Sequence, residues 1–398
     1  MICHKSQTKD FIIEITDQLS DITRHQWCDA FPTGDMYLSY DYLEALEKGL
    51  KNDIDFRYIQ FKQPETLELL GRAYVQLLRF TPNELNVDAL HNQFGNAIPD
   101  KFIKNLDARV LLCGNAFATG EHGFEFSSKI SDSQSINILT DTLKQIRKDE
   151  KKAHDEVSLI LLKDFWPESD CFVNLLKDKQ YSPFEIDVNM VVRIQPHWSE
   201  LGDYLNDLTT KFRTKVKSIL HRSEDLNMID ADTEYIESRI DRLEELFYNV
   251  MERADYRFAA LNGGALVELK KSMNEQFKLF LYELDGKIVG FGTAFVNDGH
   301  LDANFVGLDY AVNRQLSVYQ RILVDFIRFG IEHNLYSVRY GRTAEEIKST
   351  LGAEPVHMKL YGKHRNSITN QLIKPILNHV RAREFKMRKP YKAAYYGK

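Results

Sequence analysis

The residues from Leu279 to Arg342 decide the fold that this sequence predicts. They read as a β-hairpin, a third strand, a helix and a further strand: LFLYELDGKIVGFGTAFV (279–296), GHLDANFVGLD (299–309), QLSVYQRILVDFIRFGIEHN (315–334) and YSVRYGR (336–342). Asp285-Gly286 separates two runs rich in β-branched and aromatic residues, which is the pattern of a tight hairpin. In the helix, apolar residues recur every three or four positions, so one face must cover a sheet. A strand, a covering helix and a further strand then form a right-handed crossover.

The segment after this unit makes the prediction more specific. It reads YGRTAEEIKSTLGAEPVHMKLYGK (340–363): a strand ends at Tyr340, a Gly-Arg turn follows, and a short helix carries Lys348 before a last strand. The order of elements resembles the second half of the Gcn5-related N-acetyltransferase (GNAT) fold. The ending resembles BioF2-like acetyltransferase domains and the related FemA/FemX aminoacyltransferases. The resemblance implies an α/β (α+β) fold, with a mixed, mostly antiparallel sheet flanked by helices.

The first half of the chain repeats this order. LLGRAYVQLL (69–78) aligns loosely with IVGFGTAFVN (288–297), and each has a glycine in the second strand of the pair. We therefore predict tandem GNAT-like domains at 1–195 and 196–398, with the boundary near Gln195-Pro196-His197, where proline interrupts a strand. FemX-type proteins are similar, because they carry two such domains.

Composition narrows the classes of function. A chain of 398 residues is longer than one core usually supports, and a net charge of −6 argues against DNA as a partner, although a local basic site is compatible with it. The four cysteines form no CxxC pair, so neither a metal site nor a disulfide framework is expected. The sequence lacks a basic start followed by an apolar core, and it lacks an apolar stretch that could span a bilayer. These features predict a cytoplasmic protein.

Two segments are strongly basic. Between Thr209 and Arg222 there are five basic side chains and no acid: Lys211, Arg213, Lys215, Lys217 and Arg222. Such crowding costs a few tenths of a kcal/mol per like-charged pair, which indicates either a nearby anion or a solvated face. The segment resembles the basic helix that opens BioF2-like domains, and this resemblance places Arg213, Lys217 and Arg222 in ligand binding. The last twenty residues hold seven basic side chains and one acid. They are either a solvated tail or a contact for RNA, a phosphate-bearing substrate or a membrane surface.

Motifs with a sharply defined mechanism are missing. The sequence contains no GxxxxGK[ST], no GxGxxG after a strand, no HExxH and no GxSxG. The sequence therefore does not indicate an NTPase, a Rossmann dinucleotide-binding domain, a zincin metalloprotease or an α/β-hydrolase. The run GNAFATGEHG (114–123) is glycine-rich after a strand. It is either an anion-binding loop or an ordinary loop.

The candidate catalytic residues lie near the ends of two strands. Asp302 and Asn304 are two apart on a strand and point to one face, as a base and a substrate-orienting amide or as solvated groups. Tyr340 and Arg342 share a side of the next strand end, and we count Tyr340 among the catalytic candidates. Arg342 is suited to grip a carboxylate or phosphate, or to form a surface salt bridge with Glu345 or Glu346.

The resemblance adds Lys348, Arg314 and Ser317. In FemX-like enzymes the matching lysine is associated with the phosphate-bearing substrate and the transferring acyl group, although Ile347 here replaces the usual aromatic residue before it. A solvated lysine is the alternative. Arg314 and Ser317 lie where the GNAT helix begins and the cofactor pyrophosphate is held. The glycines of the GNAT loop Q/R-x-x-G-x-G/A are missing there, so side chains would obstruct a pyrophosphate. We expect Arg213, Arg342 and Lys348 to converge on a slot between two diverging strands.

These observations predict an N-acyltransferase that uses acyl-CoA as donor and an amine of a small molecule or peptide as acceptor. One alternative is a FemX-type transferase that takes its group from charged tRNA and acts on a cell-wall precursor. Another is a catalytically inactive tandem-GNAT binding protein.

Overall fold

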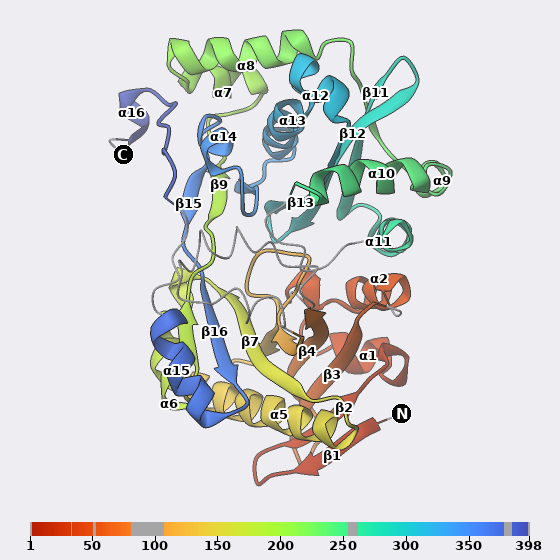
Figure 1. The fold of residues 1–398 in the computed structure, drawn as a ribbon, viewed down its shortest axis with the longest axis vertical. Coiled ribbons are helices and arrows are strands. Elements are labelled where there is room, and N and C mark those ends of the chain that lie inside the picture. The colour runs from red at the N-terminus through yellow and green to blue at the C-terminus, as the bar shows by residue number, and fades with distance from the viewer. Residues whose placement is uncertain are drawn as a thin grey trace. The chain divides into compact units, whose positions relative to one another are not determined.

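The protein is described by a computed structural model that covers residues 2–32, 34–50, 53–80, 107–253, 262–377 and 384–396. These residues divide into two compact units, each a sheet flanked by helices (Figure 1). The first unit takes in the described residues up to 187 together with 357–377. The second takes in 188–253, 262–356 and 384–396.

The first unit is built on a mixed sheet with the order β1-β2-β3-β4-β5-β7-β16-β8, and β6 pairs with β4. All neighbours are antiparallel except the parallel pair β5–β7. The strands are β1 (Ile2–Gln7), β2 (Ile12–Thr16), β3 (Asp55–Lys62), β4 (Leu69–Phe80), β5 (Ala108–Cys113), β6 (Phe124–Phe126), β7 (Val157–Phe165), β8 (Ser182–Phe184) and β16 (Lys359–His364). The helices are α1 (Arg24–Cys28), α2 (Tyr40–Leu50), α5 (Asp132–Lys152), α6 (Phe172–Asp178) and α15 (Ser367–Leu377).

Helix α5 covers one face of the first sheet. It begins at a capping box in which Ser131 and Gln134 satisfy each other's backbone N–H groups. Its buried apolar residues recur at helical spacing and join the main core of the unit: Ile136, Leu139, Leu143 and Ile146. The prediction of a helix followed by a strand in this part of the chain is confirmed.

The second unit is built on a mixed sheet with the order β10-β11-β12-β13-β14-β9-β15. Its strands are β9 (Asn189–Arg193), β10 (Asn227–Asp230), β11 (Phe277–Leu284), β12 (Lys287–Asn297), β13 (His300–Leu308), β14 (Ser337–Arg339) and β15 (Glu354–Val356). Its helices are α7 (Leu201–Asp207), α8 (Thr210–Arg222), α9 (Thr233–Glu237), α10 (Ile240–Met251), α11 (Gly263–Met273), α12 (Tyr310–Leu316), α13 (Val318–Glu332), α14 (Glu345–Ser349) and α16 (Ala393–Tyr396). The predicted hairpin is present, and Asp285 and Gly286 both have positive φ in its turn.

The predicted helix over 315–334 is divided in the structure. It is broken at Ser317, which adopts a left-handed conformation with φ of 55° between α12 and α13. Helices α9 and α10 are likewise separate, because Arg239 leaves the helical conformation. None of the helices in the described ranges has the length and apolarity that a membrane span requires.

The two sheets exchange strands along the chain. Strand β9 follows the elements of the first unit but pairs between β14 and β15 of the second sheet. Strand β16 follows the elements of the second unit but pairs between β7 and β8 of the first sheet. The two compact units therefore do not correspond to one stretch of chain before residue 195 and one stretch after it. The predicted domain boundary at residue 195 stays a prediction.

Two glycines of β12 let α13 lie close to the sheet. A Cβ atom at Gly290 would lie 2.6 Å from Cγ1 of Val318, and one at Gly292 would lie 2.6 Å from Cγ2 of Ile322. Real Cβ atoms do not approach so closely, so any side chain here forces the helix and the strand apart. The glycine predicted in the second strand of the hairpin has this packing role.

We predict that Gly292→Ala lowers the free energy of unfolding by about 1–3 kcal/mol, because it overpacks the contact between β12 and α13. The measurement is the urea midpoint of the purified protein. Gly264→Ala is the matched control. Gly264 is exposed on α11, where an added methyl group meets only the Asn262 side chain at 3.4 Å. Alanine there should be neutral or stabilise by up to about 1 kcal/mol. Equal effects of the two substitutions would contradict the packing argument.

Candidate functional site

The parallel strands β13 and β14 separate soon after they meet. They pair at three positions only: His300 with Ser337, Leu301 with Val338, and Asp302 with Arg339. Strand β13 continues to Leu308 in register with β12. No described strand pairs with the other edge of β13 beyond Asp302. We call this opening, which begins after Asp302 and Arg339, the fork.

A β-bulge in β13 accompanies the fork. Gly292 pairs with Val306 and Ala294 with Ala303, so Thr293 alone faces two residues of β13. The Thr293 hydroxyl accepts a hydrogen bond from the Phe305 N–H at 2.9 Å and donates to the Phe305 carbonyl oxygen at 3.4 Å. A bulge bends its strand and increases the local twist, so it turns β13 away from its neighbour.

The corresponding pair in the first unit does not open in this way. Strand β5 stays paired with β7 from Arg109 to Cys113, which is its last residue. The glycine-rich loop that follows is held by protein side chains. The Ala116 N–H donates to Gln76 Oε1 at 2.8 Å, and the Phe117 N–H donates to Asn115 Oδ1 at 2.8 Å. The structure therefore favours the ordinary-loop alternative for 114–123.

Asp302 lies at the closed end of the fork. Its carboxylate is buried, and Oδ1 is 3.3 Å from Nη1 of Arg339 on β14. The solvated alternative is thus wrong for Asp302, whereas Asn304 is half-buried within the bulge. Nearby His300 contacts Ser337 Oγ through Nδ1 at 2.8 Å. Burial and then the Arg339 charge lower the pKa of His300 to about 4, so this ring is neutral at pH 7.

Tyr340 is buried in the core of the unit. Its hydroxyl donates to the carbonyl oxygen of Leu323 on α13 at 2.5 Å. Burial raises the pKa of this phenol well above its usual range. The contact ties the end of β14 to the covering helix. The geometry thus gives Tyr340 a structural task, and its catalytic role stays a prediction.

Lys348 is buried as well, so the alternative of a solvated lysine is wrong. Its ammonium group donates to the carbonyl oxygens of Tyr340 at 3.0 Å, Gly341 at 3.3 Å and Arg342 at 2.5 Å. These three carbonyls belong to the turn that follows β14, and one ammonium supplies three donors. Lys348 therefore holds this turn in place. Glu346, one of the acids considered as a partner of Arg342, is ion-paired with Arg388.

Helix α8 presents its basic residues on two faces. Lys211, Lys215, Ser218 and Arg222 follow one another at intervals of four, three and four residues, so they share a face. All four line hollows in the surface of the second unit. Neither hollow is lined by Arg213 or Lys217, which lie on another side of the helix. Of the three predicted α8 ligands, the structure brings only Arg222 to a hollow.

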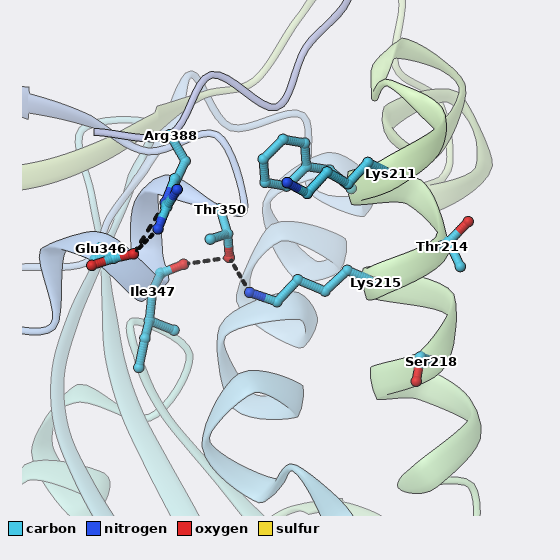
Figure 2. A pocket seen from close by; sticks show the side chains of 9 residues that line it. Lys211, Thr214, Lys215, Ser218, Glu346, Ile347, Thr350 and Arg388 are labelled. Atoms are coloured by element: carbon cyan, nitrogen blue, oxygen red, sulfur yellow. Dashed lines mark hydrogen bonds and ion pairs between the residues drawn. The ribbon is translucent and has the colours of Figure 1, made fainter. Parts of the chain in front are cut away.

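The larger hollow lies between α8 and α14 and has a volume of about 630 Å³ (Figure 2). We call it the α8 groove. Its lining residues are Lys211, Phe212, Thr214, Lys215, Ser218, Glu346, Ile347, Thr350 and Arg388. The Lys215 ammonium donates to Thr350 Oγ1 at 3.1 Å, and that hydroxyl donates to the Ile347 carbonyl oxygen at 2.7 Å. Burial and then the Arg388 charge lower the pKa of Lys215.

A second hollow of about 310 Å³ lies at the start of α13. Arg222, Arg314 and Ser317 are among its lining residues, so the structure brings these three predicted residues together. Ile347 lines both hollows, so the second hollow is a neighbour of the α8 groove. Arg213, Arg342 and Lys348 line neither of these two hollows, and their expected convergence on a slot between two diverging strands stays a prediction.

Sequence reasoning missed Lys215 and Arg388 as candidate ligands. Helical spacing could have shown that Lys211, Lys215 and Arg222 share a face. The apolar Val216 and Ile219, which are buried, mark the other face, the one that packs against the core. Nothing local could have placed Arg388. It comes from the C-terminal basic segment, more than 160 positions after α8 in the chain.

Comparisons with known proteins bear on the fold. No protein-family model and no curated protein matches the sequence. Among solved structures, FemX has a TM-score of 0.54 with 12% identity, over 93% of this chain and 100% of FemX. The C-terminal domain of a putative lysylphosphatidylglycerol synthetase from Agrobacterium fabrum has a TM-score of 0.50 with 9% identity, over 89% of this chain and 94% of that domain.

These similarities, at identities this low, concern the fold alone. A tandem GNAT protein from the clavulanic acid biosynthesis pathway also matches, with a TM-score of 0.47 and 10% identity, over 89% of this chain and 99% of that one. The chain thus has a tandem GNAT-like fold of the FemX kind, with two mixed, mostly antiparallel sheets flanked by helices. The predicted fold class is confirmed.

We predict that Lys348→Met lowers the free energy of unfolding by about 1–3 kcal/mol, because it leaves three carbonyl oxygens of the turn after β14 without their charged donor. The check is urea unfolding of the variant beside Lys287→Met, which removes an ammonium that is 65% exposed and 3.5 Å from Asp309. The control should change stability by less than about 0.5 kcal/mol. A Lys348→Met protein as stable as the parent but inactive would make Lys348 a catalytic group instead.

Proposed function

We propose that the second unit is an N-acyltransferase that moves an acyl group from acyl-CoA to an amine. The observation that carries this proposal is the fork, because it leaves one edge of a buried strand accessible to an extended ligand. Ala303 and residues 306–308 of β13 pair with β12, Asn304 and Phe305 form the bulge between them, and no described strand pairs with the other edge of this segment. An extended pantetheine arm can add to such an edge as an extra strand would.

The described residues suit the pantetheine arm of acyl-CoA better than its pyrophosphate. The edge of β13 offers alternating backbone donors and acceptors to an amide-containing arm. The start of α13 offers less to the pyrophosphate, since Ser317 is buried there and no glycine allows close approach. The thioester supplies the activated acyl group. What the chain must supply is a site for the amine and a group that takes its proton.

We assign the proton-accepting role to Asp302. Its carboxylate lies at the closed end of the fork, buried and 3.3 Å from the Arg339 guanidinium. The amine nitrogen forms a bond to the acyl carbon, the carbon–sulfur bond breaks, and the proton from the amine passes to Asp302. The thiolate that leaves takes up a proton, so charge and atoms balance. Asn304, two residues further along β13, is placed to orient the amine.

A second candidate function is the transfer of an aminoacyl group from charged tRNA. The two neighbouring hollows favour it, because five basic residues and a single acid, Glu346, line them: Lys211, Lys215, Arg222, Arg314 and Arg388. Binding that depends on phosphate contacts weakens steeply with added salt. Turnover with charged tRNA, together with no thiol release from any acyl-CoA, would select this function. No turnover with either acyl-CoA or charged tRNA would favour the third alternative, a catalytically inactive binding protein.

We predict that the purified protein releases free thiol from at least one acyl-CoA in the presence of an amine, and that Asp302→Asn lowers kcat about 100-fold or more, because a general base contributes that much. The measurement is a thiol-reagent assay over a panel of donors and amines. Asp298→Asn is the matched control. Asp298 is exposed, and its φ of 47° in the turn before β13 is one that asparagine tolerates. A parent-like rate for Asp302→Asn would remove Asp302 from the mechanism.

A further inference from the structure

The start of α13 is already engaged by the protein itself. The Tyr319 N–H, one of the N–H groups that an α-helix leaves without an intrahelical partner at its start, donates to Asn313 Oδ1 at 2.9 Å. A phosphate group bound at a helix N-terminus depends on such N–H groups and on close approach to the backbone. The buried Ser317 side chain occupies the position where a glycine would permit that approach. A phosphate-bearing donor therefore needs a different anchor.

The α8 groove has the chemistry of such an anchor. Lys211, Lys215 and Arg388 bring three positive charges to it, and Glu346 brings one negative charge. Phe212 and Ile347 add apolar surface. A groove of about 630 Å³ is larger than a single phosphate ion needs, and the hollow that Arg222 and Arg314 line is next to it across Ile347. The dimensions and charges fit an extended ligand that carries phosphate groups at more than one position.

Arg388 is fixed in this groove by the segment that carries it. The Arg388 N–H donates to Ser349 Oγ at 3.2 Å. Two residues on, the Pro390 carbonyl oxygen accepts the Thr209 N–H at 2.9 Å, and Tyr391 forms a β-bridge with Leu208. The Tyr391 side chain is buried against Trp198 and Tyr204. Residues 384–396 are thus a docked part of the second unit, and the alternative of a mobile tail is wrong for them.

The charges in the groove are poorly balanced. Figure 2 shows Arg388 turned to Glu346, and Lys215 reaching from α8 to Thr350. Among the described residues, the hydroxyl of Thr350 is the one hydrogen-bond partner of the Lys215 ammonium, which has three donors. After burial, the charge of Arg388 is the next cause that lowers the pKa of Lys215; Glu346 acts against it, and Arg222 and Lys211 lower the pKa further. A bound anion would relieve this repulsion.

We propose that the α8 groove binds the phosphate groups of the donor through Lys215 and Arg388, in place of the backbone at the start of α13. This inference rests on the proposed transferase function, because it names where the donor of that reaction is held. Arg388 reaches a phosphate with a planar fork that can make two parallel hydrogen bonds, and Lys215 adds a point charge. Arg222 and Arg314 add two positive charges in the neighbouring hollow.

The test is direct binding of inorganic pyrophosphate by isothermal titration calorimetry at fixed ionic strength. We expect Lys215→Met and Arg388→Met each to weaken binding at least about tenfold, which corresponds to about 1.4 kcal/mol. Lys271→Met is the control, since it removes one positive charge from α11, where Lys271 pairs with Glu237. It should change the affinity less than twofold. Thermal midpoints of all variants show whether each is folded, and Arg388→Lys, which keeps the charge, serves if Arg388→Met releases the segment.

Parent-like binding by both groove variants would overturn the proposal, and so would an equal loss in Lys271→Met. Titrations with CoA and with uncharged tRNA then identify the source of the phosphate groups. At least one of these two ligands must lose affinity in the groove variants and keep it in the control, or the proposal fails. Because binding is measured without turnover, a failure here leaves the transferase proposal standing. Normal pyrophosphate binding without any transfer activity would instead reject the proposed function alone.

Discussion

The fork depends on each of its two strands keeping its outer neighbour. Strand β13 stays hydrogen-bonded to β12 as far as Leu308. On the other side, the chain after β14 follows β9: the Tyr340 N–H donates to the Met190 carbonyl oxygen at 2.8 Å, and the Met190 N–H donates to the Gly341 carbonyl oxygen at 3.1 Å. Buried backbone groups must be paired, so neither strand can abandon its partner to close the gap. Strand β9 therefore holds the chain after β14 on the side away from β13.

Several residues with candidate roles in catalysis turn out to reinforce this arrangement. Lys348 holds the three carbonyls of the turn after β14, and Tyr340 ties that turn to α13 through Leu323. Hydrogen bonds to a buried ammonium are among the stronger ones in proteins. The turn that ends at Arg342 is thus rigid, and so is the Asp302–Arg339 pair at the closed end of the fork. A rigid frame of this kind positions a substrate without large rearrangement.

Local patterns predicted the parts of the fold that local chemistry controls. The Asp285-Gly286 turn and the apolar face of α13 are examples, since φ preferences and helical spacing decide them. The break at Ser317 had no such signal, because serine gives no hint of a left-handed conformation. The exchange of β9 and β16 is beyond sequence patterns, since both strands pair with partners far away in the chain.

The same distinction applies to the candidate site. Arg222, Arg314 and Ser317 were predicted and do meet in one hollow, whereas Arg213 and Lys217 share the sequence run but lie on another helical face. Counting charges identified the basic helix, and only the packing of Val216 and Ile219 decides which charges point to the groove. Arg388 joins them through a docked C-terminal segment whose anchors are tyrosine and tryptophan rings.

The proposed function requires the fork in the second unit to hold the reacting end of the donor. The decisive experiment is a crystal structure of the protein with a non-hydrolysable acyl-CoA analogue. We expect density for the acyl and pantetheine atoms along residues 303–308 of β13, with the acyl carbon within reach of Asp302. Density for the analogue in the first unit, or on the second unit away from β13, would contradict it.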